Sequence, residues 1–332
     1  MVAEPGLTPA VSRADVEVAR GRLGTRIRQT PVIKIEAGQL GGGQPAFWCK
    51  LESLQVTGAV KARGAMNSLL AAGQSAGLTA AGACAASGGN HGLAVAWAAR
   101  SLGVPAAVFV PTTCPPIKLR RLAGYGAGVT VAGEVYEECR IRAESYAEET
   151  GALLVHPFDD SATVAGAGTV SAEFREQVPH LDTVLIAVGG GGLLAGALAA
   201  LQGMTTRVVA VEPVTARCLG AAQDAGEPVD VPVSGHAIDS LGVRRVGQLA
   251  FDAAVAHDVQ HVDVTDDAII DAQVSAWEEL RIGLEPGGAT AMAALLSGAY
   301  QPADNEAVGV LCCGGNFDIA SVLADRTVRV PD

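Results

Sequence analysis

Lysine is scarce in this chain of 332 residues, which has four lysines among 23 basic residues and a formal net charge of −12. No run rich in lysine and arginine occurs, which argues against a nucleic acid or an anionic membrane as a partner. No apolar run reaches the length that spans a bilayer. Residues 1–20 carry acidic side chains and lack the apolar core of a signal peptide. We therefore expect a cytoplasmic protein that does not bind membranes.

The seven cysteines follow no recognisable pattern. Their number is odd and no C-x-x-C spacing occurs, so neither a disulfide framework nor a zinc site is indicated. Reduced thiols are typical of the cytoplasm. With 49% apolar residues, the chain can bury a large core and is long enough for two domains.

Short valine-rich runs alternate with longer alanine-rich segments. The runs predict strands at 106–110, 129–131, 153–155, 183–188, 208–211 and 308–312. The longer segments predict helices at 92–102, 134–150, 193–201 and 266–281, the last with Thr265 as its N-cap. Because the strand runs are apolar without alternation, we expect parallel sheets covered on both faces, in an α/β fold.

A run of four glycines, Gly189, Gly190, Gly191 and Gly192, follows the strand expected at 183–188 and precedes a helix expected to start at Leu193. Glycine lets backbone N–H groups approach an anion closely, and a helix N-terminus attracts negative charge. The run therefore predicts a phosphate-binding turn. A tight turn without a ligand is the alternative.

The same segment also fits a dinucleotide-binding fingerprint. Gly190, Gly192 and Ala195 satisfy G-x-G-x-x-A, and Glu212 ends the strand expected at 208–211. This region alone leaves a nicotinamide cofactor and another phosphorylated cofactor equally open.

Lys61 follows a Thr-Gly turn and has small or apolar neighbours. Desolvation at such a place lowers the pKa of an amine and makes it a usable nucleophile. The alternative interpretation is a surface lysine beside Arg63.

The segment from Thr57 to Ala65 reads T-G-A-V-K-A-R-G-A. It resembles the lysine segment of the fold-type II pyridoxal-phosphate enzymes, and within them the threonine dehydratase and serine racemase branch, whose usual form is T-G-S-F-K-x-R-G-A. The resemblance implies that the cofactor is pyridoxal 5'-phosphate and that Lys61 binds it covalently. The departures at Ala59 and Val60 should alter packing rather than chemistry.

A second segment, S-G-G-N-H-G, resembles the S-x-G-N-H loop of the same enzymes. The resemblance implies that its residues bind the substrate carboxylate and that the asparagine also contacts the ring hydroxyl of the cofactor. The residues concerned are Ser87, Gly88, Gly89, Asn90 and His91. We interpret the histidine as part of the loop architecture rather than as a catalytic base.

Further segments match the same family in the same order, from about residue 25 to residue 320. Gly189 to Leu193 resembles its phosphate-binding loop. Cys313 begins a C-G-G-N segment that resembles S-G-G-N, whose first side chain faces the pyridine nitrogen. Glu285 matches a glutamate near the cofactor ring, although an acid before Pro286 is also an ordinary helix start.

A cation site is a weaker expectation. Glu212 and the carbonyl of Ala216 match a segment that binds a cation in some family members, but Cys218 stands where a second acid is expected. Magnesium and calcium require oxygen ligands. We therefore expect no strong metal site, and a structural role for Glu212 is an equal alternative.

The resemblance implies the tryptophan synthase β-like architecture, with two three-layer α/β/α domains and mostly parallel sheets. The expected small domain spans residues 78–158 and is inserted into a large cofactor-binding domain made of residues 1–77 and 159–332. The family also implies a homodimer.

The implied activity is the dehydration and deamination of a small hydroxy-amino acid, such as L-threonine or L-serine, to a 2-oxo acid and ammonia. A neutral thiol at Cys313 makes the cofactor a weaker electron sink than a carboxylate would, which favours β-elimination. Racemases of this branch have a second serine where this chain has Gly88, so we expect little racemisation. The alternatives are a serine racemase, a β-replacement synthase and, more remotely, a nicotinamide-dependent dehydrogenase.

Overall fold

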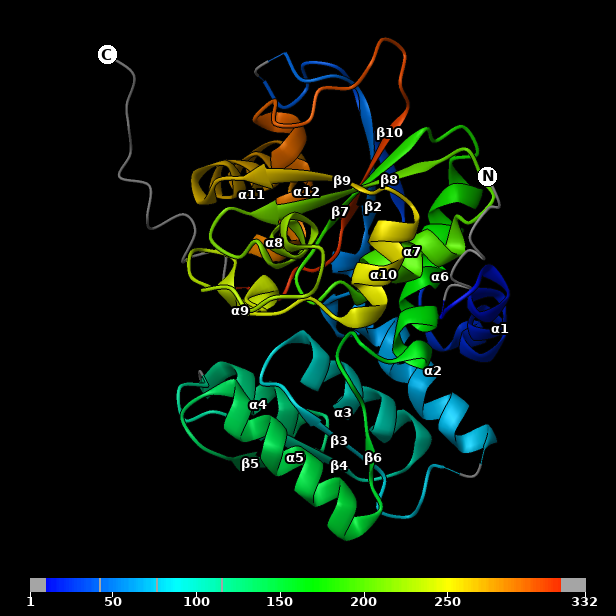
Figure 1. The fold of residues 1–332 in the computed structure, drawn as a ribbon, viewed down its shortest axis with the longest axis vertical. Helices are drawn as coiled ribbons and strands as arrows, with labels where there is room; N and C mark the ends of the chain where they lie inside the picture. Colours follow the sequence, from blue (N-terminus) through cyan, green and yellow to red (C-terminus); the bar gives the residue numbers. More distant parts are fainter. Residues whose placement is uncertain (1–9, 42, 76, 115, 318–332) are drawn as a thin grey trace.

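Two open sheets, each covered by helices, make up the computed structural model, which describes residues 10–41, 43–75, 77–114 and 116–317 (Figure 1). The α-helices are α1 Arg13–Leu23, α2 Lys61–Gln74, α3 Asn90–Leu102, α4 Pro116–Gly124, α5 Tyr136–Thr150, α6 Ser161–Gln177, α7 Gly192–Ala200, α8 Cys218–Ala225, α9 Ile238–Leu241, α10 Gln248–Ala256, α11 Asp266–Leu280 and α12 Pro286–Leu296. The strands are β1 Val32–Ile35, β2 Phe47–Leu51, β3 Ala83–Ala86, β4 Ala106–Val110, β5 Gly128–Val131, β6 Leu153–Leu154, β7 Thr183–Ala187, β8 Arg207–Pro213, β9 Gln260–Val264 and β10 Val308–Cys312. Three short 3-10 helices, η1 Gly24–Arg26, η2 Glu52–Leu54 and η3 Val56–Gly58, complete the described chain.

Parallel pairing dominates both sheets. The six-stranded sheet has the order β1-β2-β10-β7-β8-β9, and the four-stranded sheet has the order β5-β4-β3-β6. Only the pair of β1 and β2 is antiparallel among the described strands. Every residue of β7 and β10 is buried, because helices cover both faces of the sheet at these central strands. The expected α/β fold with mostly parallel sheets is confirmed.

The six expected strands are all present, with ends shifted by at most two residues. Three expected helix starts are wrong by one or two residues: α7 begins at Gly192 rather than Leu193, α3 begins at Asn90 rather than at residue 92, and α5 begins at Tyr136 rather than at residue 134. For α7 and α3, glycine-rich sequence hid the first turn. Thr265 caps α11 as expected, since its side chain accepts a hydrogen bond from the N–H of Ala268.

Four strands had no clear sequence signal. β3 consists of three alanines and a cysteine, residue types with little strand preference, and only its position between β4 and β6 makes it a strand. β9 mixes exposed and buried residues without regular alternation at the edge of its sheet. β1 and β2 form the antiparallel pair at the opposite edge.

The strands of the four-stranded sheet all lie between Ala83 and Leu154, in the lower half of Figure 1, and the six-stranded sheet fills the upper half. The division of the chain at residues 78 and 158 remains a prediction. The loops that follow β3, β7 and β10 leave the carboxyl ends of parallel strands, where ligands of open α/β sheets bind. No helix in the described ranges is long and apolar enough to cross a bilayer.

Candidate active site

Lys61 is the first residue of α2 and lies after a turn that ordinary residues avoid. Thr57 and Gly58 both have positive φ angles, 65° and 79°. A side chain at position 58 would collide with the amide of Asn316, so glycine is required there. The Lys61 Nζ donates to the carbonyl of Pro157 at 2.8 Å. Burial lowers the pKa of Lys61 to about 8, against the opposing effect of Cys313 and Glu285.

The glycine run between β7 and α7 offers unpaired hydrogen-bond donors. Within the described chain, the backbone N–H groups of residues 189–194 have no acceptor, and the first N–H of α7 that is paired belongs to Ala195. Six adjacent donors at a helix N-terminus fit a phosphate group.

Neighbouring residues also leave no room for a side chain at two of these glycines. A Cβ at Gly192 would lie 2.7 Å from the backbone of Phe158, and one at Gly190 would overlap the Phe158 ring. Pro157, the partner of Lys61, immediately precedes Phe158. One short segment therefore holds both the lysine and the glycine run in position.

The loop from Ser87 to His91 forms the start of α3. The Oγ of Ser87 accepts a hydrogen bond from the N–H of Gly89 at 3.2 Å. His91 is buried, and its Nε2 donates to the carbonyl of Val155 at 2.8 Å. Burial and the nearby Lys61 amine lower the pKa of His91 to about 3, so the ring is neutral near pH 7. These contacts support a structural rather than a basic role for His91.

Gly88 faces a thiol that the sequence analysis did not single out. A Cβ at position 88 would lie 2.6 Å from the Sγ of Cys114. A serine at this position would therefore require the Cys114 side chain to move.

A chain of amide contacts joins three distant loops. The Nδ2 of Asn90 donates to Glu285 Oε1 at 2.5 Å, and the Nδ2 of Asn316 donates to Asn90 Oδ1 at 2.7 Å. Asn316 also donates to the carbonyl of Thr57 at 2.7 Å and accepts from Arg121 at 2.6 Å. The sequence analysis quoted Asn316 only as part of a motif and missed Arg121, because no local pattern indicates a contact between residues 195 positions apart.

Glu285 is buried at the N-cap of α12. Burial raises the pKa of its carboxyl to about 7, while the hydrogen bonds from Asn90 and the Asn316 backbone and the charges of Lys118 and Arg121 act in the opposite direction. The folded protein thus favours the protonated carboxyl.

This raised pKa predicts a pH-dependent effect of Glu285→Gln. Because the pKa of Glu285 is higher in the folded than in the unfolded protein, loss of its proton destabilises the fold. The contribution of Glu285 to stability is therefore complete below the unfolded pKa and is lost as pH rises through about 7. In the cofactor-free protein we expect the variant to be more stable than the parent by roughly 1–3 kcal/mol at pH 8.5, and equal to it at pH 4. Urea denaturation at the two pH values measures this difference. A variant that is less stable than the parent at pH 8.5 would contradict it.

Cys313 follows β10 and is partly buried, with its Sγ 3.4 Å from the carbonyl of Gly287. Burial and the nearby Glu285 raise the pKa of the Cys313 thiol far above its ordinary value. The thiol is therefore neutral. Backbone contacts bring the three segments together: the N–H of Val60 donates to the carbonyl of Cys313 at 2.9 Å, and the N–H of Glu285 donates to the carbonyl of Gly314 at 3.1 Å.

Glu212 is not part of this site. Its carboxylate is fully buried and accepts hydrogen bonds from the N–H groups of Leu219 and Gly220, both at 2.9 Å, and contacts the Nε2 of His261 at 2.8 Å. It therefore stabilises the N-terminus of α8. Both oxygens are in use, which leaves none for a cation shared with Ala216 or for the ribose of a dinucleotide. The described residues contain no group of three potential metal-ligating side chains of the types His, Cys, Asp and Glu.

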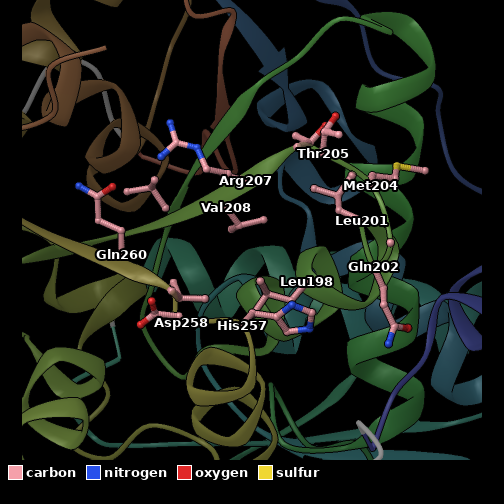
Figure 2. Close-up of a pocket in the computed structure, with 14 residues that line it drawn as sticks. Leu198, Leu201, Gln202, Met204, Thr205, Arg207, Val208, His257, Asp258 and Gln260 are labelled. Atoms are coloured by element: carbon pink, nitrogen blue, oxygen red, sulfur yellow. The ribbon is translucent and has the colours of Figure 1, made fainter. Parts of the chain in front are cut away.

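A separate cavity of about 260 Å³ lies at the amino ends of β8 and β9, with Arg207, His257 and Gln260 in its lining (Figure 2). The glycine run lies at the opposite, carboxyl end of β7. This cavity contains none of the residues of the candidate site.

The candidate site thus defines a class of protein: an enzyme with a desolvated lysine, an anion-binding glycine turn and a neutral thiol at the carboxyl ends of parallel strands. Residues 23–314 match the family of pyridoxal-phosphate dependent enzymes. The chain belongs to this family, and its cofactor is pyridoxal 5'-phosphate.

Similar proteins include both racemases and ammonia-lyases. The chain is similar to serine racemase from Oryza sativa subsp. indica, with 33% identity over 311 residues that cover 92% of this chain and 90% of the relative. It is also similar to L-threonine ammonia-lyase from Geobacter sulfurreducens, with 35% identity over 311 residues, 92% of this chain and 76% of the relative. The solved structure of maize serine racemase matches with a TM-score of 0.87 and 30% identity, covering 95% of this chain and 97% of that chain. The protein is therefore a member of the serine/threonine dehydratase and serine racemase group.

Proposed function

We propose that this protein dehydrates and deaminates a small hydroxy-amino acid, such as L-threonine or L-serine, to a 2-oxo acid and ammonia. The observation that carries the proposal is that the desolvated Lys61 amine and the neutral Cys313 thiol come from adjoining segments, since the N–H of Val60 donates to the carbonyl of Cys313 at 2.9 Å. A neutral partner for the cofactor ring favours prompt loss of a β-substituent over long-lived carbanion chemistry.

The residues fit the cofactor. The free N–H groups of the glycine run would hold its phosphate, Lys61 would bind it covalently, and Asn90, Glu285 and Cys313 would contact its ring. When bound, the cofactor supplies an electron sink for the negative charge that develops at the substrate Cα.

The side chains then perform the remaining steps. The Ser87 hydroxyl and the loop N–H groups up to His91 hold the substrate carboxylate and so orient the Cα–H bond. Lys61 removes the Cα proton as a general base, and a pKa near 8 leaves a useful neutral fraction at neutral pH. The β-hydroxyl leaves as water, with its proton supplied by Lys61. The released enamine hydrolyses to the 2-oxo acid and ammonia.

Racemisation is the closest alternative. It requires a proton donor on the face of Cα opposite Lys61, and Gly88 has no side chain to provide one. A β-replacement synthase is a second alternative, and it predicts that sulfide or an amine diverts the product. A nicotinamide-dependent dehydrogenase would need the Glu212 carboxylate, which is already fully hydrogen-bonded.

Product analysis tests the proposed reaction. Holoenzyme incubated with L-serine is expected to form pyruvate and ammonia in equal amounts and D-serine at less than about a tenth of that rate, because only Lys61 exchanges the Cα proton. Chiral chromatography and a coupled pyruvate assay give both rates. Faster formation of D-serine than of pyruvate would identify a racemase, and a product that retains added sulfide would identify a synthase.

The remaining expectations are proposals on the same basis. We propose a homodimer, a cytoplasmic location and a small domain at residues 78–158. Light scattering of the holoenzyme tests the first, since a monomeric mass contradicts it.

A further inference from the structure

Two cations on α4 reach toward the candidate site. Lys118 and Arg121 are three residues apart and so lie on the same side of the helix. The Nζ of Lys118 pairs with Asp239 of α9 at 3.1 Å, and Arg121 donates to Asn316, which follows β10. Figure 1 shows α4 at the edge of the four-stranded half that faces α9. Both side chains therefore connect α4, which packs on the four-stranded sheet, to residues of the part that contains the six-stranded sheet.

Arg121 has no anionic partner among the described residues. Its side chain is only partly exposed, and no carboxylate in the described ranges forms an ion pair with it. Asn316 Oδ1 is its one hydrogen-bond acceptor there, although a guanidinium has five donors. A partly buried guanidinium with unused donors is a strong site for a carboxylate, which it can bind through two parallel hydrogen bonds.

Arg121 is linked by hydrogen bonds to the loop that is expected to bind the substrate. Asn316 bridges it to Asn90, which belongs to the loop expected to hold the substrate α-carboxylate. Lys118 adds a second positive charge, and both cations act on the buried Glu285. The charge of Lys118 is paired with Asp239, whereas the charge of Arg121 has no carboxylate ion pair in the described ranges.

We infer that Arg121 binds a second carboxylate on the substrate side chain, so the preferred substrate is a β-hydroxy amino dicarboxylic acid, of which 3-hydroxyaspartate is the smallest. The inference rests on the proposed dehydratase function. In the reaction the Cα–H and Cβ–O bonds break and water leaves. Readdition of water to the enamine releases ammonia, so 3-hydroxyaspartate gives oxaloacetate and ammonia without any further reactant.

The first test measures binding without turnover. L-Aspartate and L-asparagine have almost the same shape, differ by one charge and lack the β-hydroxyl, so they report the charge preference alone. Absorption titration of the holoenzyme should give a Kd for aspartate about 10- to 100-fold below that for asparagine. Arg121→Gln should bring the ratio near one, and Arg121→Lys should restore part of it. Arg120→Gln, an exposed position on the same helix, is the matched control and should leave the ratio unchanged.

The second test is kinetic. The kcat/KM for L-threo-3-hydroxyaspartate should exceed that for L-serine, and Arg121→Gln should lower the former about 100-fold and the latter less than about 3-fold. An equal loss on both substrates would mean that Arg121 only fastens α4 to Asn316, and it would overturn the inference.

The two proposals fail separately. Turnover of serine or threonine with no preference for the dicarboxylate would overturn the inference and leave the dehydratase in place. Tight, Arg121-dependent binding of aspartate without elimination from any hydroxy-amino acid would overturn the dehydratase. Equal binding of aspartate and asparagine to the parent enzyme rejects the inference even if the variants do not fold.

Discussion

Replacing Lys61 with alanine is expected to reduce kcat on L-threonine or L-serine on the order of 10⁴-fold, because the variant lacks the general base at Cα. The visible absorption band of the cofactor-loaded protein should change as well, since the covalent link to the amine is lost. Steady-state assays and an absorption spectrum of the same preparation measure both effects.

The other lysines cannot replace Lys61. Lys34, Lys50 and Lys118 each pair with a carboxylate, whereas Lys61 has no such partner among the described residues. Lys34→Ala is the matched control, because Lys34 is about half exposed and should be dispensable. An active Lys61→Ala enzyme, at more than a tenth of the parental rate, would refute the assigned role.

Removing the carboxylate of Glu173 should lower the free energy of unfolding by about 3–5 kcal/mol, the cost of leaving buried cations unpaired. Glu173 in α6 pairs with Lys50 and lies 3.1 Å from Arg63, which also pairs with Glu52 at 2.7 Å. Lys50, Glu52 and Arg63 are almost completely buried, so water cannot replace the missing partner. Urea denaturation of Glu173→Ala measures the loss.

A neighbouring glutamate provides the control for Glu173→Ala. Glu176 lies on the same helix and pairs with Arg20, but its side chain is 58% exposed. Because solvent screens exposed ion pairs, Glu176→Ala should cost no more than about 1 kcal/mol. Equal losses in the two variants would show that burial does not determine the cost. Arg63 lies two residues after Lys61, so this cluster also anchors the helix that carries the proposed catalytic lysine.

The sequence by itself determined the parallel α/β architecture, the glycine turn and the position of Lys61. Each depends on residues that are close in the chain. A strand that is apolar at every position, such as 183–188, must be covered on both faces of its sheet. Four glycines before a helix leave backbone N–H groups free to bind an anion. The family motifs identify the cofactor from the sequence as well, because each motif is a continuous segment of the chain.

Only the tertiary structure decided which side chains meet around Lys61. Asn90 and Asn316 are 226 residues apart, and Lys61 and Pro157 are 96 apart, so no local period or spacing relates them. The same holds for β3, whose alanine-rich sequence forms a strand only because two neighbouring strands offer it hydrogen bonds. The sequence position of Glu212 is compatible with binding a cation or a ribose. In the structure its carboxylate instead accepts hydrogen bonds at the N-terminus of α8 and so has a structural role. Helix packing likewise placed the Arg121 guanidinium beside Asn316, where no carboxylate of the described residues forms an ion pair with it.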